Sequence, residues 1–179
     1  LSEIVSIVLN GGTTVNGNVI TTTIGDHQSL SLQDLKNADG VTSSLTSGGM
    51  IIDQPTTASS LDLKLNKVGE KTRSTEKHFL IDIMGEEITH LNIENENASS
   101  LIFFNSGGAL TEINITGDGS INLDTLPSEV TILDAANAIA DIELKTAGSG
   151  TIVETGSGND KVKLGNGADN VTTGDGDDT

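Results

Sequence analysis

The stretch Thr155–Thr179 reads T-G-S-G-N-D-K-V-K, L-G-N-G-A-D-N-V-T and T-G-D-G-D-D-T, which is two complete nonapeptides and most of a third. Glycine stands at the second and fourth places of each nonapeptide, aspartate at the sixth, and valine at the eighth where the repeat reaches it. A period of nine residues matches neither an α-helix nor a heptad repeat. It favours short strands that alternate with tight turns, in which the glycines turn the chain and the valine points inward.

These repeats carry the oxygen donors that a calcium site needs. The recurring residues are Gly156, Gly158, Gly165, Gly167, Gly174 and Gly176, together with Asp160, Asp169 and Asp178. Calcium takes about six to eight hard oxygen ligands in flexible geometry, and glycine-rich turns leave backbone carbonyls accessible to it. Without a cation, stacked aspartate turns would bring like charges close together. One copy of G-x-G-x-D is explained by turn propensity alone, whereas three copies in phase favour calcium binding.

The nonapeptides resemble the calcium-binding repeat G-G-x-G-x-D-x-U-x of RTX proteins, which forms a parallel β-helix. The first place, usually glycine in that family, is here Thr155, Leu164 and Thr173, and the resemblance covers about 25 of 179 residues. It implies a right-handed β-roll in which two nonapeptides form one coil and calcium lies between turns one coil apart.

Carried onto this chain, the resemblance places Asp160 and Asp178, 18 residues apart, against one ion. Backbone carbonyls of the turns at Gly156–Gly158 and Gly174–Gly176 would complete the ligand set. The next-coil partner of Asp169 would lie beyond Thr179. Asp169 would therefore pair with the earlier turn at residues 148–150, which lacks an aspartate.

Three earlier segments share one alternating design: I-T-H-L-N-I (Ile88–Ile93), L-T-E-I-N-I (Leu110–Ile115) and I-A-D-I-E-L (Ile139–Leu144). Their loose spacing is typical of a degenerate repeat, and strand-turn units at this pitch suit the coils of a β-solenoid. The G-x-G turns at 117–119 and 148–150 are followed by Ile121 and Ile152 where the later repeats have aspartate. We therefore predict an all-β parallel β-solenoid, or β-roll, with a degenerate N-terminal part and C-terminal coils of RTX type.

An all-β sandwich followed by a short calcium roll is the alternative. A solenoid requires parallel pairing between the three alternating segments, and a sandwich requires antiparallel pairing. The turns at 10–12 (N-G-G) and 16–18 (N-G-N), with β-branched flanks, indicate hairpins near the N-terminus. We accordingly expect a β-rich segment or separate module at 1–75, degenerate solenoid coils at 76–150 and calcium-binding repeats at 151–179.

Composition restricts the function further. The net charge of −17 argues against a nucleic-acid partner, because phosphate contacts need clustered Lys and Arg. No stretch reaches the roughly 18 apolar residues of a membrane span, so we expect no membrane insertion. The chain has no cysteine, which is compatible with a secreted bacterial protein. It begins without Met and stops inside a repeat, and we therefore expect a piece of a longer protein.

No catalytic motif is present in the sequence. His27, His78 and His90 lie on separate segments without an H-E-x-x-H pattern, and no G-x-S-x-G occurs. We therefore predict a protein that is not an enzyme.

The composition together with the nonapeptides resembles bacterial surface-layer proteins that carry RTX repeats and leave the cell by type I secretion. This resemblance implies a structural protein at the bacterial cell surface that folds with calcium and associates with itself in a lattice. A cell-surface polysaccharide or lipopolysaccharide would be contacted through regions outside this sequence. The alternatives are an RTX adhesin or toxin segment, or the accessory region of an RTX protease or lipase.

Overall fold

The computed structural model describes residues 7–10, 14–15, 19–23, 29–33, 36–37, 49–53, 59–71, 76–84, 87–98, 100–106, 109–147 and 150–179. Strands β1 to β19 are the only regular secondary structure in these ranges, so the described part of the protein is all-β. None of the described residues belongs to a helix that is long and apolar enough to cross a membrane.

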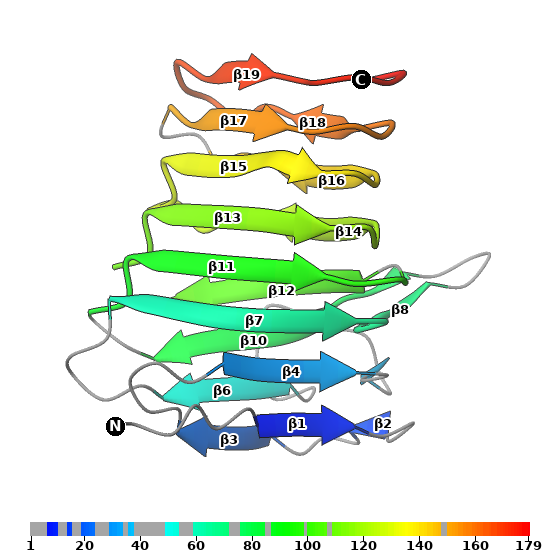
Figure 1. Cartoon of the computed structure of the whole chain (residues 1–179). Coiled ribbons are helices and arrows are strands. Elements are labelled where there is room, and N and C mark those ends of the chain that lie inside the picture. The colour runs from blue at the N-terminus through cyan, green and yellow to red at the C-terminus, as the bar shows by residue number, and fades with distance from the viewer. Residues whose placement is uncertain are drawn as a thin grey trace, which may run out of the picture.

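Most of the described strands belong to two parallel sheets, one of eight strands and one of seven (Figure 1). The first sheet contains, in order, β1 (Ile7–Asn10), β4 (Ser29–Gln33), β7 (Ser60–Asn66), β11 (His90–Asn95), β13 (Glu112–Gly117), β15 (Ile132–Ala138), β17 (Ile152–Thr155) and β19 (Asn170–Thr172). The second contains β3 (Val19–Thr23), β6 (Gly49–Asp53), β10 (Phe79–Met84), β12 (Ser100–Ser106), β14 (Ile121–Thr125), β16 (Ile142–Lys145) and β18 (Lys161–Lys163). From β10 onward, consecutive strands alternate between the two sheets.

Two short pairs lie outside these sheets. Strands β2 (Thr14–Val15) and β5 (Lys36–Asn37) pair in parallel. Strands β8 (Glu70–Lys71) and β9 (Glu76–Lys77) form the one antiparallel pair in the described part of the chain.

The parallel pairing rules out the sandwich alternative for the described strands, and it shows that the hairpin prediction was wrong. Strand β1 pairs with β4 and β3 pairs with β6, each in parallel. The turn residues 11–13 and 16–18 lie outside the described residues. An Asn-Gly turn between β-branched residues indicates that the chain reverses direction locally. It does not determine whether the two flanking strands pair with each other. Both sheets continue across residue 75, and the division at 75 and 150 stays a prediction.

The first two of the three alternating segments pair as predicted. Strands β11 and β13 are parallel and in register, with Leu91 opposite Ile113 and Ile93 opposite Ile115. The assignment of the third segment was wrong, because Ile142–Lys145 belongs to the second sheet and the neighbour of β13 is β15. Both sheets bury alternate side chains, so the alternating pattern alone does not identify the sheet.

Successive coils shorten toward the C-terminus. His90 lies opposite Glu112, Glu112 opposite Ile132, Ile132 opposite Ile152, and Ile152 opposite Asn170. These pairings are 22, 20, 20 and 18 residues apart. The last coil therefore has the length of two nonapeptides.

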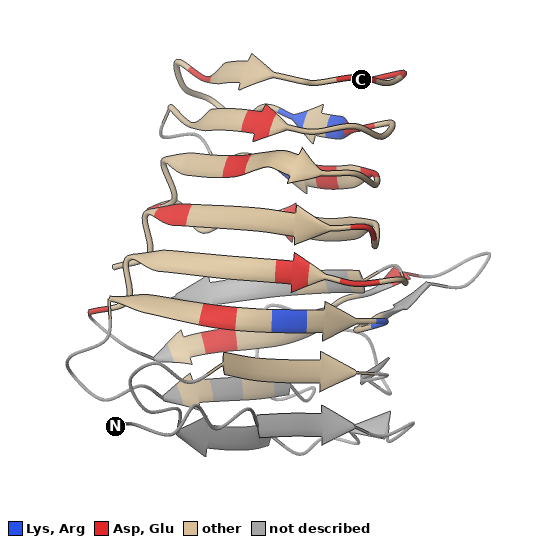
Figure 2. Ribbon diagram, viewed as in Figure 1, with Lys and Arg blue, Asp and Glu red and all other residues tan. Residues whose placement is uncertain are grey.

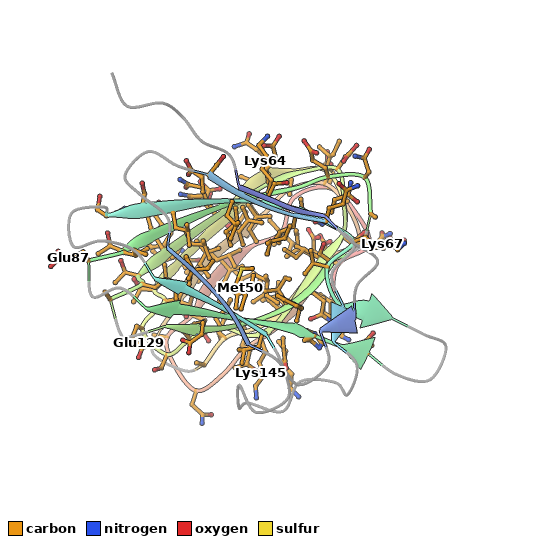
Figure 3. The ribbon with its side chains drawn as sticks, turned by 90° about the horizontal axis from the view of Figure 1, so that it is seen from below. Met50, Lys64, Lys67, Glu87, Glu129 and Lys145 are labelled. Carbon is orange, nitrogen blue, oxygen red and sulfur yellow. The ribbon has the colours of Figure 1, made fainter. Side chains whose placement is uncertain are left out.

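The core lies between the two sheets and consists of rows of aliphatic side chains from successive coils. One such row runs through residues paired in register: Leu61, Leu91, Ile113, Leu133, Val153 and Val171. Its first five members are fully buried, and the repeat valines Val162 and Val171 pack against the core, as predicted. Seen along the stack in Figure 3, Met50 lies between the sheets, whereas Lys64, Glu87 and Lys145 lie outside. Each fully buried aliphatic side chain contributes about 1.5–3 kcal/mol.

Replacing Ile113 in the middle of this row by alanine tests the packing. We expect Ile113→Ala to lower the free energy of unfolding by about 2–5 kcal/mol, because the neighbouring coils cannot close around the cavity. Urea unfolding in calcium-containing buffer measures this. Ile139→Ala is the matched control, since Ile139 is 64% exposed, and its effect should stay within about 0.5 kcal/mol. Equal losses in both variants would contradict the assigned core.

Candidate metal centre

The turns that follow the first-sheet strands are stacked directly on one another. We call their shared position the turn column; its members are Asn95, Gly117, Ala138, Gly156 and Gly174. The carbonyl of each of the first four accepts an N–H of the next turn: from Gly119 (3.0 Å), Ile139 (3.1 Å), Ser157 (3.0 Å) and Asp175 (3.1 Å), respectively. These bonds fix the distance between successive turns.

Glycine at the column positions of the repeats is required by this close approach. A Cβ atom on Gly156 would lie 2.0 Å from the carbonyl oxygen of Ala138, and one on Gly174 would lie 1.9 Å from that of Gly156. Gly158 and Gly176 in addition have φ angles of +139° and +145°, which residues with a side chain rarely adopt. In the first and third repeats, the first glycine of G-x-G thus allows the close approach of the preceding turn, and the second also provides the positive φ angle.

The sixth-place aspartates all make the same contact, each accepting the backbone N–H of the residue 18 positions earlier. Ile142 N–H donates to Asp160 Oδ1 (2.8 Å), Thr151 N–H to Asp169 Oδ1 (2.7 Å), and Asp160 N–H to Asp178 Oδ1 (2.9 Å). Each carboxylate therefore reaches back across the gap to the preceding coil. Asp160 and Asp178 lie on successive stacked turns; that they share one ion stays a prediction.

The fifth-place side chains reach across the same gaps in the opposite direction. Asp141 Oδ1 accepts the N–H of Asn159 (2.7 Å), and Asn159 Oδ1 accepts the N–H of Asp177 (3.0 Å). Two carboxylates, those of Asp141 and Asp160, consequently cross the single gap between their turns. Sequence reasoning missed Asp141 because its turn lacks glycine, although counting 18 residues back from Asn159 would have found it.

One oxygen of this arrangement is left without a partner. Asp160 is only 1% exposed, and its Oδ2 has no hydrogen-bond partner among the described residues. A buried charged oxygen that lacks a partner is unfavourable by several kcal/mol. A cation in the gap between the turns would give this oxygen a partner.

Asp169 lies at the opposite edge of the coil, next to Thr146. Its Oδ2 contacts Thr146 Oγ1 (3.3 Å), and that hydroxyl oxygen also accepts the N–H of Gly165 (2.7 Å). The coil equivalent of Asp169 is Thr151, so the prediction that Ile152 takes the aspartate place was wrong by one residue. The predicted pairing with the turn at 148–150 falls partly outside the described residues, because 148 and 149 are not described. Gly167 is exposed on this loop.

Side chains alone do not form a complete metal cage in the described ranges, since they contain no group of three or more His, Cys, Asp or Glu suited to hold an ion. A cation at this edge would need backbone carbonyl oxygens as additional ligands. Acidic residues nevertheless gather at the turns on one edge of the stack, as Figure 2 shows. The exposed members of that group include Asp175 and Asp177.

A second polar feature covers the outer face of the first sheet, at a shallow hollow over β7, β11 and β13. There Asn114 Nδ2 donates to Asn92 Oδ1 (3.0 Å), and Asn92 Nδ2 donates to Asp62 Oδ1 (2.8 Å). Lys64 pairs with Glu94, whose hydrogen bond and charge raise the pKa of the lysine. These groups satisfy one another, which identifies a surface ladder that ties neighbouring coils together.

No protein-family model, curated protein or solved structure matches this chain.

Replacing Asp160 by asparagine removes the negative charge of the side chain and keeps its size, so the two contributions can be measured separately. We expect Asp160→Asn to be at least as stable as the parent in chelator, because Oδ1 can still accept from Ile142 while the buried charge is gone. The same variant should lose the rise in melting temperature that calcium gives the parent. Thermal unfolding with and without calcium measures both effects.

Asp177→Asn is the control for this experiment, because it makes the same change at an exposed neighbouring position. It should leave the calcium response unchanged. A calcium response in Asp160→Asn equal to that of the parent would show that this carboxylate holds no cation.

Proposed function

We propose that this chain is a calcium-binding β-solenoid of the RTX β-roll type and serves as a structural part of a secreted bacterial surface-layer protein. The observation that carries the proposal is the buried, unpartnered Oδ2 of Asp160, whose carboxylate reaches from its own glycine turn back to Ile142 of the preceding turn. It is supported by the 18-residue contact rule that all three repeat aspartates obey.

The solenoid assignment is supported by the path of the chain. Consecutive strands from β10 onward alternate between two parallel sheets, so each pair of strands with its two turns makes one coil. Coils that contact only their neighbours are the defining property of a solenoid. A parallel stack of this kind has no need of large aromatic side chains, which agrees with a chain of three Phe and no Trp or Tyr.

Calcium suits the proposed site better than other common metals. The available donors are carboxylates of Asp160 and Asp178 and backbone carbonyls of the turns at Gly156–Gly158 and Gly174–Gly176, all of them hard oxygens, which calcium accepts in flexible geometry. Bound there, calcium would neutralise the carboxylates that lie between the turns. The protein residues position these oxygens through the N–H bonds of Ile142 and Asp160.

Calcium binding of this kind would make folding depend on whether the protein is inside or outside the cell. Extracellular calcium modules have dissociation constants of about 10⁻⁴–10⁻³ M, so they fill outside the cell and stay empty in the cytosol. A ligand that binds only the folded state stabilises it in proportion to RT ln(1 + [L]/Kd). The acidic repeats would thus remain open during export and close at the cell surface.

A structural role, and no catalysis, follows from this proposal. In the stack of coils, the turns of Asp160 and Asp178 lie along one edge, and repetition of such a stack in a lattice would present that edge periodically. Calcium ions and further copies of the same protein are its proposed partners. Polysaccharide or lipopolysaccharide would be contacted through other parts of the protein.

Titration with calcium tests the site directly. Asp160→Ala and Asp178→Ala should each remove the shared ion and lower the stoichiometry found by isothermal titration calorimetry. Val162→Asp should disturb the coil without removing a ligand. Magnesium is the control ion, because it demands stricter octahedral geometry and gives up its water reluctantly. Unchanged calcium stoichiometry in both aspartate variants would contradict the ligand assignment.

Electron microscopy of the protein in calcium distinguishes the surface-layer role from its alternatives. Ordered two-dimensional sheets that form with calcium and dissolve with chelator are the expected result. Hydrolytic activity without sheets would assign the chain to the accessory region of an enzyme. Binding to host cells without sheets would identify an adhesin or a toxin.

A further inference from the structure

The interior of the stacked turns changes in chemistry from one coil to the next. Facing the turn column across each turn is a second row of stacked positions, which we call the facing column: Ser100, Ile121, Ile142, Asp160 and Asp178. The first four side chains of this column are at most 2% exposed. Each turn is therefore filled by one residue from each column, and the pairs can be compared directly.

In the first of these turns a neutral amide satisfies the backbone. Asn95 is fully buried, and its Nδ2 donates to the carbonyl oxygens of Ser120 (2.8 Å) and Ala98 (3.4 Å). Its Oδ1 accepts from Ser100 Oγ (2.8 Å), which in turn accepts the N–H of Val68 (3.2 Å). The amide thus binds carbonyl oxygens from two successive turns, without any charge.

The next two turns are filled by apolar side chains. Gly117 faces Ile121 and Ala138 faces Ile142, and both isoleucines are buried. Hydrophobic packing stabilises these turns, and no unpartnered acceptor among the described residues lies in them. Aspartate enters the facing column only in the fourth of these turns, where Asp160 faces Gly156, and it continues in the fifth, where Asp178 faces Gly174.

We infer that the stack is divided into a cation-independent base, whose turns are closed by Asn95 and by Ile121 and Ile142, and a cation-dependent end that begins at the gap between Asp141 and Asp160. This inference rests on the proposed calcium binding and adds where in the chain calcium acts. Asn95 performs with two N–H donors the task that a cation performs for the carbonyl oxygens of the later turns. The base is folded before calcium binds. Its last strands are the template on which the acidic coils fold once calcium is present.

Hydrogen exchange of the whole chain, read by mass spectrometry in calcium and in EGTA, tests this division. Peptides from 109–125 should keep their protection in EGTA, whereas those from 152–172 should lose it. Loss of protection in both regions would overturn the inference and leave calcium-dependent folding standing. Unchanged protection in both regions would overturn the proposed function and the inference with it.

Asn95→Asp tests the role of the amide within the base. A carboxylate there cannot donate to Ala98 and Ser120 and adds a buried charge, so protection of peptides containing Ser100 or Gly119 should fall roughly tenfold or more in EGTA. Asn137→Asp makes the same change at an exposed residue of β15 and should leave that protection unchanged. Protection of Asn95→Asp equal to that of the parent in EGTA would overturn the assignment to Asn95.

Discussion

Parallel stacking at the spacing of a β-ladder is the constraint on which the rest of this structure depends. Neighbouring strands of a sheet lie about 4.8 Å apart, so every residue of a coil has its equivalent from the next coil directly above it. Each residue of a turn therefore lies close to the residue at the same position of the next turn. Like residues therefore form rows, and the chemistry of each row, whether aliphatic, amide or acidic, decides how firmly two coils are held together.

The aliphatic rows and the acidic rows have opposite effects on the stability of the stack. Inside the sheets, Leu91 over Leu61 and Ile113 over Leu91 add apolar contact with every coil. At the C-terminal turns, repetition of aspartate adds negative charge with each further coil, and the fifth- and sixth-place side chains offset part of it by accepting backbone N–H groups. Asp160 has one oxygen satisfied in this way and one buried without a partner. Hydrogen bonding to the backbone positions the acidic turns, but it leaves charge in the gap.

Part of this architecture could be predicted from the sequence because the constant length of the nonapeptide fixes the spacing between equivalent residues of successive coils. A period of nine, doubled, gives the 18-residue separation of Asp160 from Asp178, and the eighth-place valine correctly indicates the inward face. The earlier coils were harder to place because their lengths vary. The segment Ile139–Leu144 has the same alternation as its supposed equivalents yet lies in the other sheet, and only the pairing partner reveals this. Asp141 and Asn95 escaped notice for a related reason: neither belongs to a nonapeptide, and their roles arise from the residues stacked above and below them.

The position of the acidic coils within the stack has a consequence of its own. In an array where each coil contacts only its neighbours, stability is close to a sum of terms for each coil and each junction between coils. A junction that contains a buried charge is the weakest one, and its effect depends on where it lies. Such a junction in the middle of the stack would divide the structure into two pieces whenever the cation was absent. Placed beyond Ile142, it leaves the rows from Leu61 to Leu133 continuous. If calcium binds as we propose, its loss would open the acidic coils and spare the surface on which they close again.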